Sequence, residues 1–182
     1  MLRSDLIASL SGSGIKIEQL SSFQRILLTT DGTLTDILEA YVWEPIQIVK
    51  LKQENVRVRQ AIPLLDIAAQ TEVLQREVLL RGASSATNYL HATSLLVLDR
   101  LDPVLREELI TTQEPLGKLM IQARLETFRE IMKCSSRKAL DEGKVFGEPP
   151  DTALISRTYR VFAQRRPFIL ITESFPASYF RD

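Results

Sequence analysis

The sequence contains few of the residues that build metal sites and cross-links. Its 182 residues include one cysteine, Cys134, and one histidine, His91. A lone cysteine excludes an intramolecular disulfide and cannot form a thiolate metal site by itself. With a single histidine there is no His-x-x-His spacing either, so the sequence predicts no transition-metal site.

Motifs that bind nucleotides or activate a nucleophile are also missing. The chain has neither a GxxxxGK[ST] phosphate loop nor a GxGxxG turn, which argues against a nucleotide-binding fold. It has no GxSxG nucleophile elbow, and the sequence offers His91 no obvious triad partners. Because His91 lies in a strand-like run at 89–94, we interpret it as a structural histidine.

The sequence lacks an excess of charge of either sign, and it lacks long apolar runs. Lys and Arg together number 23, as do Asp and Glu, which leaves a formal net charge of zero. This balance gives no electrostatic signal for nucleic acid or for an anionic membrane. Residues 1–5 do not begin a signal peptide, and no run approaches the roughly 20 apolar residues of a membrane helix. We therefore expect a soluble, cytoplasmic protein with no membrane span and no nucleic-acid partner.

What the sequence does contain is typical of one globular domain spanning 1–182. Hydrophobic residues make up 45% of the chain and charged residues 25%, and this length is enough for one buried core. The apolar spacing and capping residues predict helices at 6–10 and 17–28, a short helix capped by Asp31 or Thr33, and helix starts at Asp102 and Thr112.

Apolar residues at a period of two predict the strands. They lie at 46–51, 56–61, 71–80, 88–98, 153–163 and 168–175, and the ambiguous segment 124–132 is also assigned as a strand. Segment 135–151 is expected to be a loop. Most of these strands are joined as hairpins, including 46–51 with 56–61 around Glu54 and Asn55. The sequence therefore predicts an α+β fold, a single antiparallel β-sheet covered by helices.

Two charged side chains interrupt the apolar faces of these strands. In a strand every second side chain shares a face, so Glu173 points with Ile171 and Phe175, and Arg76 points with Leu74 and Val78. A buried charge is costly unless an opposite charge or a matched hydrogen-bonding group meets it. Glu173 and Arg76 could pair with each other as a structural salt bridge. They could instead hold a small anionic ligand that carries a hydroxyl group.

Four local features, taken in order, resemble the chorismate lyase family. They are TTDGTLTDILEAY at 29–41, REVLL at 76–80, PLG at 115–117 and ITESFP at 171–176. The match covers most of the chain, and the first segment looks most like the branch found in cyanobacteria and plastids. These enzymes convert chorismate to 4-hydroxybenzoate and pyruvate, so the resemblance implies a lyase with this substrate and these products.

The resemblance also implies a set of site residues. Arg76 would grip the ring carboxylate with help from the backbone N–H groups of Leu34 and Leu116, and Glu173 would hold the ring hydroxyl. Glu173 and Arg76 are therefore the expected catalytic residues, with Glu173 acting as acid, base or anchor. The segments after Leu34 and around Leu116 would close over the ligand as lids. The reaction needs no cofactor, because forming an aromatic ring supplies the thermodynamic drive.

The family resemblance carries further expectations and an alternative. It implies a role in supplying the aromatic head group of quinones of the plastoquinone type, and retention of the product with product inhibition. The same fold resembles the effector-sensing domain of some bacterial transcription regulators, so the alternative is a non-catalytic domain that binds small aromatic acids. The segment ahead of the first predicted strand is short and not notably basic, so a sensor would need a partner subunit. The sequence carries no signal for the oligomeric state.

Overall fold

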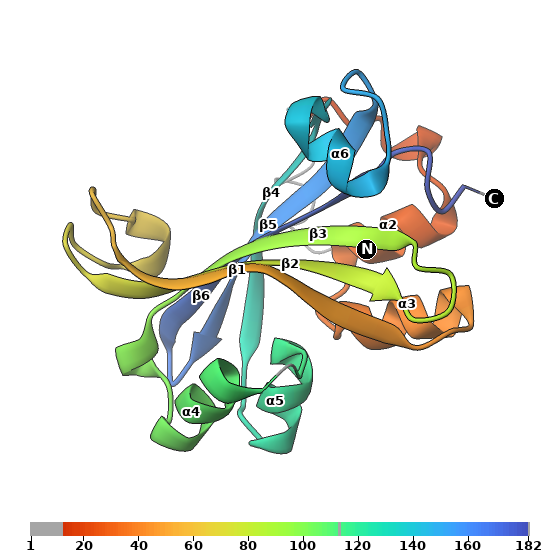
Figure 1. Cartoon of the computed structure of the whole chain (residues 1–182). Coiled ribbons are helices and arrows are strands. Elements are labelled where there is room, and N and C mark those ends of the chain that lie inside the picture. Colours follow the sequence, from red (N-terminus) through yellow and green to blue (C-terminus); the bar gives the residue numbers. More distant parts are fainter. Residues whose placement is uncertain (1–12, 113, 182) are drawn as a thin grey trace.

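The computed structural model describes residues 13–112 and 114–181, and in this part of the chain six strands form one antiparallel sheet (Figure 1). The strands are β1 (Ile46–Arg57), β2 (Glu72–Gly82), β3 (Asn88–Leu96), β4 (Phe128–Lys138), β5 (Ala153–Ala163) and β6 (Arg166–Pro176). Their order in the sheet is β1-β2-β3-β6-β5-β4. The last strand thus lies at the centre, between the β2–β3 hairpin and the β4–β5 pair.

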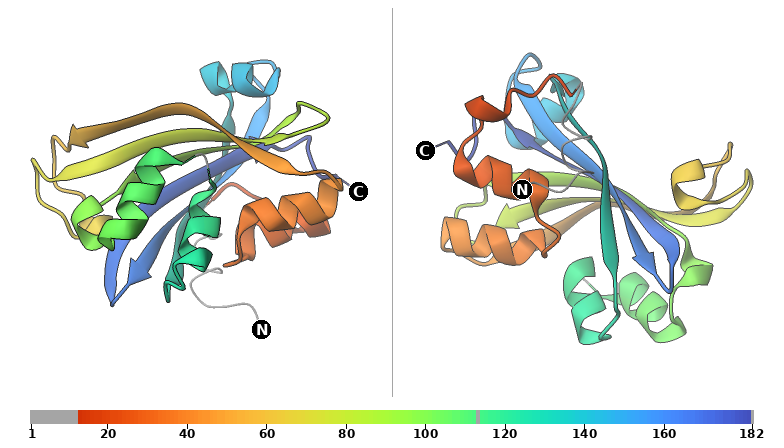
Figure 2. Two further views of the ribbon diagram at one scale, coloured as in Figure 1. Left: turned by 60° about the horizontal axis from the view of Figure 1, so that its bottom comes forward. Right: turned by 180° about the vertical axis from the view of Figure 1, so that it is seen from behind.

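Helices cover one face of this sheet. They are α2 (Ser22–Thr29), α3 (Leu34–Val42), α4 (Pro103–Thr111) and α5 (Leu116–Gln122), all on the same side in Figure 2, whereas α6 (Gly143–Phe146) lies on the other side. Short 3-10 turns are η1 (Ile17–Gln19), η2 (Pro63–Leu65), η3 (Leu98–Arg100) and η4 (Leu140–Glu142). The predicted α+β fold with an antiparallel sheet covered by helices is confirmed.

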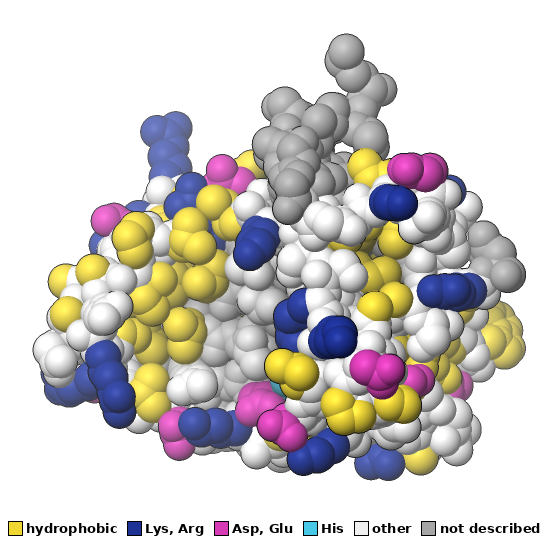
Figure 3. Space-filling view, turned by 90° about the horizontal axis from the view of Figure 1, so that it is seen from above, with side chains coloured by type: hydrophobic (Ala, Val, Ile, Leu, Met, Phe, Trp, Pro, Cys, Tyr) yellow, Lys and Arg dark blue, Asp and Glu magenta, His cyan; other side chains and the backbone are white. Residues whose placement is uncertain are grey.

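The main core fills the space between the four helices and the sheet. Leucines of the helices, such as Leu27, Leu38 and Leu105, bury themselves against Leu96 and Ile169 of the central strands. A smaller apolar cluster lies toward the η2 end, where hydrophobic side chains gather on the face seen in Figure 3. No helix in the described residues is both long and apolar enough to cross a membrane.

Helix starts follow the capping signals in the sequence. Asp102 accepts a hydrogen bond from the Val104 backbone N–H at 2.9 Å, and Pro103 occupies the first helical position, as predicted for α4. Helix α3 begins after Thr33, which has the extended backbone of a capping residue but makes no capping hydrogen bond with its side chain. The helix predicted at 6–10 lies outside the described residues.

The predicted hairpin at 46–61 is wrong, because β1 is one continuous strand of 12 residues. A bulge between Lys50 and Lys52 shifts the alternation of inward and outward side chains. The sequence pattern therefore changes within β1, and this change resembles the boundary between two strands. The shift also places Gln53 directly opposite Arg76 on β2. The bulge therefore supplies a polar partner for a charge that faces the core.

Two further assignments need correction. The predicted loop at 135–151 is largely ordered structure, since β4 continues to Lys138 and pairs with β5 along its length before η4 and α6 follow. The strand assigned at 124–132 begins only at Phe128. Pairing with the already recognised strand β5 extends β4, and this is information that no local sequence pattern contains.

His91 lies on the face of the sheet opposite the four covering helices. Its Nδ1 is 2.9 Å from Glu142 Oε1, and its Nε2 is 2.9 Å from Glu77 Oε1. Burial lowers the pKa of His91, but the hydrogen bonds and charges of Glu142 and Glu77 outweigh burial, so the net shift is upward. Burial likewise opposes ionisation of Glu142, yet hydrogen bonds from His91 and Arg137 bring its pKa down to about 2.

This network predicts a stability that declines on both sides of mildly acidic pH. The contribution of His91 is fully present below its ordinary pKa of 6.5 and is lost as the pH rises through its higher folded value. The contribution of Glu142 is present above 4.5 and is lost as the pH falls toward 2. Urea unfolding over a pH series measures both. As the pH rises above 6.5, the free energy of unfolding should fall more for the wild type than for His91→Gln. The same pH dependence in both proteins would show that the pKa of His91 is not raised in the folded state.

Candidate active site

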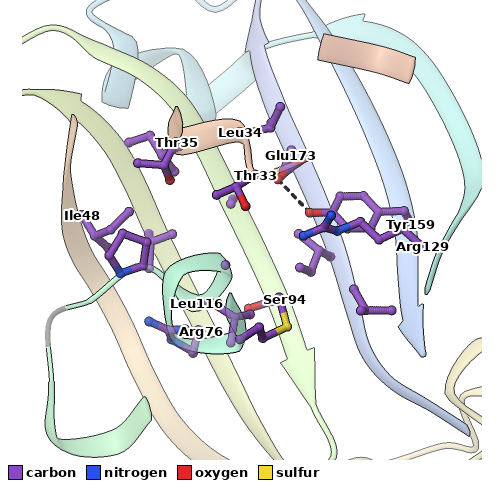
Figure 4. A pocket seen from close by; sticks show the side chains of 18 of the residues that line it. Thr33, Leu34, Thr35, Ile48, Arg76, Ser94, Leu116, Arg129, Tyr159 and Glu173 are labelled. Carbon is purple, nitrogen blue, oxygen red and sulfur yellow. Dashed lines mark hydrogen bonds between the residues drawn. The ribbon is translucent and has the colours of Figure 1, made fainter. Parts of the chain in front are cut away.

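A cavity lies between the helix-covered face of the sheet and the first turns of α3 and α5 (Figure 4). The space inside it that water can enter is about 90 Å³. Its wall includes three charged side chains, one phenol and two leucines, which are Arg76, Arg129, Glu173, Tyr159, Leu34 and Leu116. The structure therefore brings the four site residues predicted from sequence into the lining of one cavity.

Arg76 and Glu173 share this cavity without forming the salt bridge that the sequence left open. Arg76 lies on β2 and Glu173 on β6, with β3 between the two strands. Arg76 donates from Nε to Gln53 Oε1 at 3.1 Å. Among the described residues, the ion pair of Glu173 is with Arg157 of β5.

Two donors on β5 hold the Glu173 carboxylate. Arg157 Nε lies 2.7 Å from Oε2, and the Tyr159 hydroxyl donates to Oε1 at 2.9 Å. The Arg157 side chain is only 2% exposed and that of Glu173 10%, so both charges lie inside the protein. Arg157 also donates to the Thr30 carbonyl at 2.6 Å, which ties the pair to the segment ahead of α3. These contacts offset part of the cost of burying the two charges, while Arg157 Nη2 is buried without a hydrogen-bond partner among the described residues.

The ionisation of the two donors follows from their surroundings. Burial is the largest influence on the pKa of Arg157 and lowers it, but the charge and hydrogen bond of Glu173, with Tyr159 and Cys134, together outweigh burial, and the net shift is upward. Burial and the charge of Glu173 raise the pKa of Tyr159 above its ordinary value, so the phenol stays protonated and can donate. The carboxylate therefore faces the cavity in a fixed orientation, held by one charge-balancing donor outside the cavity lining and by one neutral donor that itself lines the cavity.

Arg76 sits on the opposite side of the cavity in Figure 4. Burial lowers its pKa, yet an arginine side chain is not deprotonated in proteins. Lys50 is near enough that burial and the charge of Arg76 both lower its pKa. This side of the cavity is consequently positive and suits an anion.

The starts of α3 and α5 form the remaining wall. Leu34 and Leu116 are the first residues of these helices, and neither Thr33 nor Pro115 caps its helix with a side-chain hydrogen bond. First-turn N–H groups have no partner within their own helix. The two helix starts also touch, because a Cβ added to Gly117 would lie 2.8 Å from Thr33 Cγ2. Only a residue without a side chain allows this approach.

Sequence reasoning missed Arg157, Tyr159 and Arg129. The alternation that located Arg76 and Glu173 also runs through 153–163, where Arg157 and Tyr159 share the inward face with Val161. That signal was present and could have revealed both donors. Arg129 was hidden because 124–132 fits a helix or a strand, and the direction of its side chain depends on which of these forms. Within the described residues, no group of three or more His, Cys, Asp or Glu side chains is placed to hold a metal ion.

Comparison with known protein families identifies the family of this chain. The family model described as chorismate pyruvate-lyase Rv2949c-like matches residues 28–181. The chain belongs to this family of chorismate pyruvate-lyases. A chorismate pyruvate-lyase from Mycobacterium leprae is 33% identical over 92% of this chain and 80% of the relative. One from Mycobacterium tuberculosis is 30% identical over 92% of this chain and 86% of the relative.

Comparison with solved structures shows that this chain shares its fold with domains of transcriptional regulators. The effector domain of PhnF from Mycobacterium smegmatis superposes with a TM-score of 0.66 at 15% identity, covering 81% of this chain and 90% of that domain. The chain spans 64% of the longer PhnF structure. A GntR-family transcriptional regulator from Bacillus cereus superposes with a TM-score of 0.59 at 10% identity, over 75% of this chain and 95% of that structure. At these identities the likeness concerns the fold alone.

The pair between Arg157 and Glu173 predicts strong energetic coupling. Glu173→Gln or Arg157→Met alone leaves one buried charge without its partner, which should lower the free energy of unfolding by about 3–5 kcal/mol. The double variant should lose much less than the sum of the two. Urea unfolding of the single and double variants measures the coupling.

A matched control exists on the neighbouring strands. Arg160 Nε contacts Glu130 Oε2 at the same distance, 2.7 Å, but these side chains are 24% and 33% exposed. Glu130→Gln should therefore cost no more than about 1 kcal/mol. Additive losses of unfolding free energy at Arg157 and Glu173, or equal losses at the two ion pairs, would show that burial does not strengthen the coupling between Arg157 and Glu173.

Proposed function

We propose that this protein converts chorismate to 4-hydroxybenzoate and pyruvate. The observation that carries the proposal is a single cavity with the guanidinium of Arg76 on one side and the carboxylate of Glu173 on the other. The ring carboxylate binds the planar fork of Arg76, a geometry that suits two parallel hydrogen bonds. The backbone N–H groups of Leu34 and Leu116 add donors to the same anion, and their side chains supply apolar walls for the ring.

The hydroxyl end of the substrate meets Glu173 in this arrangement. An ionised carboxylate has about four acceptor positions, and Arg157 and Tyr159 each take one of them. Positions therefore remain for a ligand hydroxyl. Glu173 serves at least as an anchor for this hydroxyl, and proton transfer at the neighbouring ring carbon is the second role open to it.

The reaction itself asks little more of the protein than orientation and charge stabilisation. The ether bond at C3 of the ring breaks, the electron pair leaves with the enolpyruvyl oxygen, and C4 loses its proton. The released enolate takes up a proton at its methylene carbon to give pyruvate, and the ring becomes aromatic. Because aromatisation drives the elimination, we propose that the enzyme works without a cofactor, through positioning and electrostatic stabilisation.

Product retention follows from the same cavity. The product keeps both the ring carboxylate and the hydroxyl, so it matches Arg76 and Glu173 as well as the substrate does. We therefore propose that 4-hydroxybenzoate inhibits the enzyme and that opening of the lids formed by the starts of α3 and α5 limits turnover. A role in supplying the head group of quinones of the plastoquinone type, the cyanobacterial and plastid affinity, and a cytoplasmic location remain predictions from the sequence.

A second candidate function is an effector-binding domain that does not turn its ligand over. The fold likeness to the PhnF effector domain favours this candidate. Membership of a family of chorismate pyruvate-lyases favours the enzyme. The two functions share the cavity and differ only in whether chorismate is consumed, so a product assay separates them.

Purified protein incubated with chorismate, without added metal or nucleotide, should release 4-hydroxybenzoate and pyruvate in equal amounts. Chelator should leave the rate unchanged. Arg76→Met is the matched inactive variant, because it keeps an apolar stem of similar length and removes the guanidinium. Chromatographic separation of the products over time measures the reaction. Tight binding of 4-hydroxybenzoate without any loss of chorismate would instead identify an effector-binding domain.

A further inference from the structure

The cavity contains a second arginine whose role the proposed function leaves open. Arg129 lies on β4 at the edge of the sheet, and it lines the same cavity as Arg76. The register places the two on one face, because a row of facing residues crosses the sheet from Arg129 through Val161, Ile169 and Leu96 to Leu74, two residues before Arg76. Four strand spacings of about 4.8 Å separate β2 from β4, so their backbones lie roughly 19 Å apart along the sheet.

Arg129 belongs to the same end of the cavity as Glu173. Figure 4 shows its side chain beside Tyr159 and Glu173, with Arg76 across the cavity. Burial is the largest influence on the pKa of Tyr159 and raises it, whereas the positive charge of Arg129 acts in the opposite direction. Arg129 and Tyr159, the phenol that donates to Glu173, line the same cavity. The cavity thus has an arginine at each end and a hydroxyl acceptor beside the second arginine.

We propose that Arg129 binds the carboxylate of the enolpyruvyl group, the second anionic group of chorismate. This inference rests on the proposed function. The enolpyruvyl ether is attached at C3, next to the C4 hydroxyl. With the hydroxyl at Glu173 and the ring carboxylate at Arg76, the enolpyruvyl carboxylate lies at the end that holds Arg129. A guanidinium presents the planar donor pair that a carboxylate accepts.

The electrostatics of this end agree with a second anion. Glu173 is itself negative, but the buried guanidinium of Arg157 lies against it at 2.7 Å and balances its charge. A substrate carboxylate therefore does not meet an uncompensated negative charge there. When the C3–O bond breaks, negative charge develops on the enolpyruvyl oxygen, and a cation that already holds this group is placed to stabilise it.

This assignment gives Arg129 and Arg76 different ligands. Arg76 contacts the ring carboxylate, which substrate and product share, whereas Arg129 contacts only the part of the substrate that leaves. Removing the guanidinium of Arg129 should therefore weaken the binding and turnover of chorismate and leave the affinity for 4-hydroxybenzoate unchanged. A purely structural role would change both together.

The test compares Arg129→Met, Arg129→Lys and the wild type. Loss of a charged hydrogen-bonding partner should lower kcat/KM for chorismate about 10- to 100-fold in Arg129→Met, with a smaller loss in Arg129→Lys, which keeps the charge. The dissociation constant of 4-hydroxybenzoate, measured by calorimetry, should be unchanged in both. Lys133→Met is the matched control. Lys133 is an exposed residue of β4 that lies opposite Thr158 in the strand register, and its side chain is on the face away from the cavity.

Three results would overturn the inference. They are an equal weakening of chorismate turnover and 4-hydroxybenzoate binding, no effect of Arg129→Met on turnover, and an effect no larger than that of Lys133→Met. If the wild type does not consume chorismate, the proposed lyase function fails instead. The inference is then tested by binding alone, where Arg129→Met should weaken chorismate and not 4-hydroxybenzoate, and equal changes would refute it.

Discussion

The buried ion pair between Arg157 and Glu173 is the interaction on which the cavity depends. A carboxylate that faces the interior from a central strand would destabilise the fold unless a cation met it there. Arg157 supplies that cation from the adjoining strand and also binds the Thr30 carbonyl, while Tyr159 fixes the second oxygen. One cluster therefore allows a charge in the interior, orients it toward the cavity and connects it to the segment that leads into α3.

The sheet performs two tasks on one face. Part of that face packs leucines against the covering helices, and part leaves room for a ligand between the strands and the starts of α3 and α5. Two local features make this division possible. A bulge in β1 places Gln53 opposite Arg76, and the absence of a side chain at Gly117 lets the start of α5 approach Thr33. The PhnF effector domain has the same fold, and a fold alone does not determine function.

Much of the fold and part of the site could be predicted from local patterns. The period-two alternation placed Arg76 and Glu173 on inward faces, and capping residues located the start of α4. The partner of Glu173 could not be chosen in this way, because only the sheet order puts β5 beside β6 and leaves β3 between Glu173 and Arg76. The continuation of β4 into the predicted loop, and with it the direction of Arg129, likewise depends on pairing between strands distant in sequence.

We propose that Glu173 binds the hydroxyl of an aromatic acid whose carboxylate lies at Arg76. A melting titration of the wild type with 4-hydroxybenzoate and with benzoate tests it most directly. A ligand that binds only the folded state stabilises it by RT ln(1 + [L]/Kd), so at a given concentration the tighter ligand raises the melting temperature more. Benzoate lacks the hydrogen bond to the charged acceptor, worth about 1.5–3 kcal/mol. 4-Hydroxybenzoate should therefore stabilise the protein at much lower concentration than benzoate. Equal stabilisation by the two acids would show that Glu173 does not contact the hydroxyl, and the proposed orientation would be wrong.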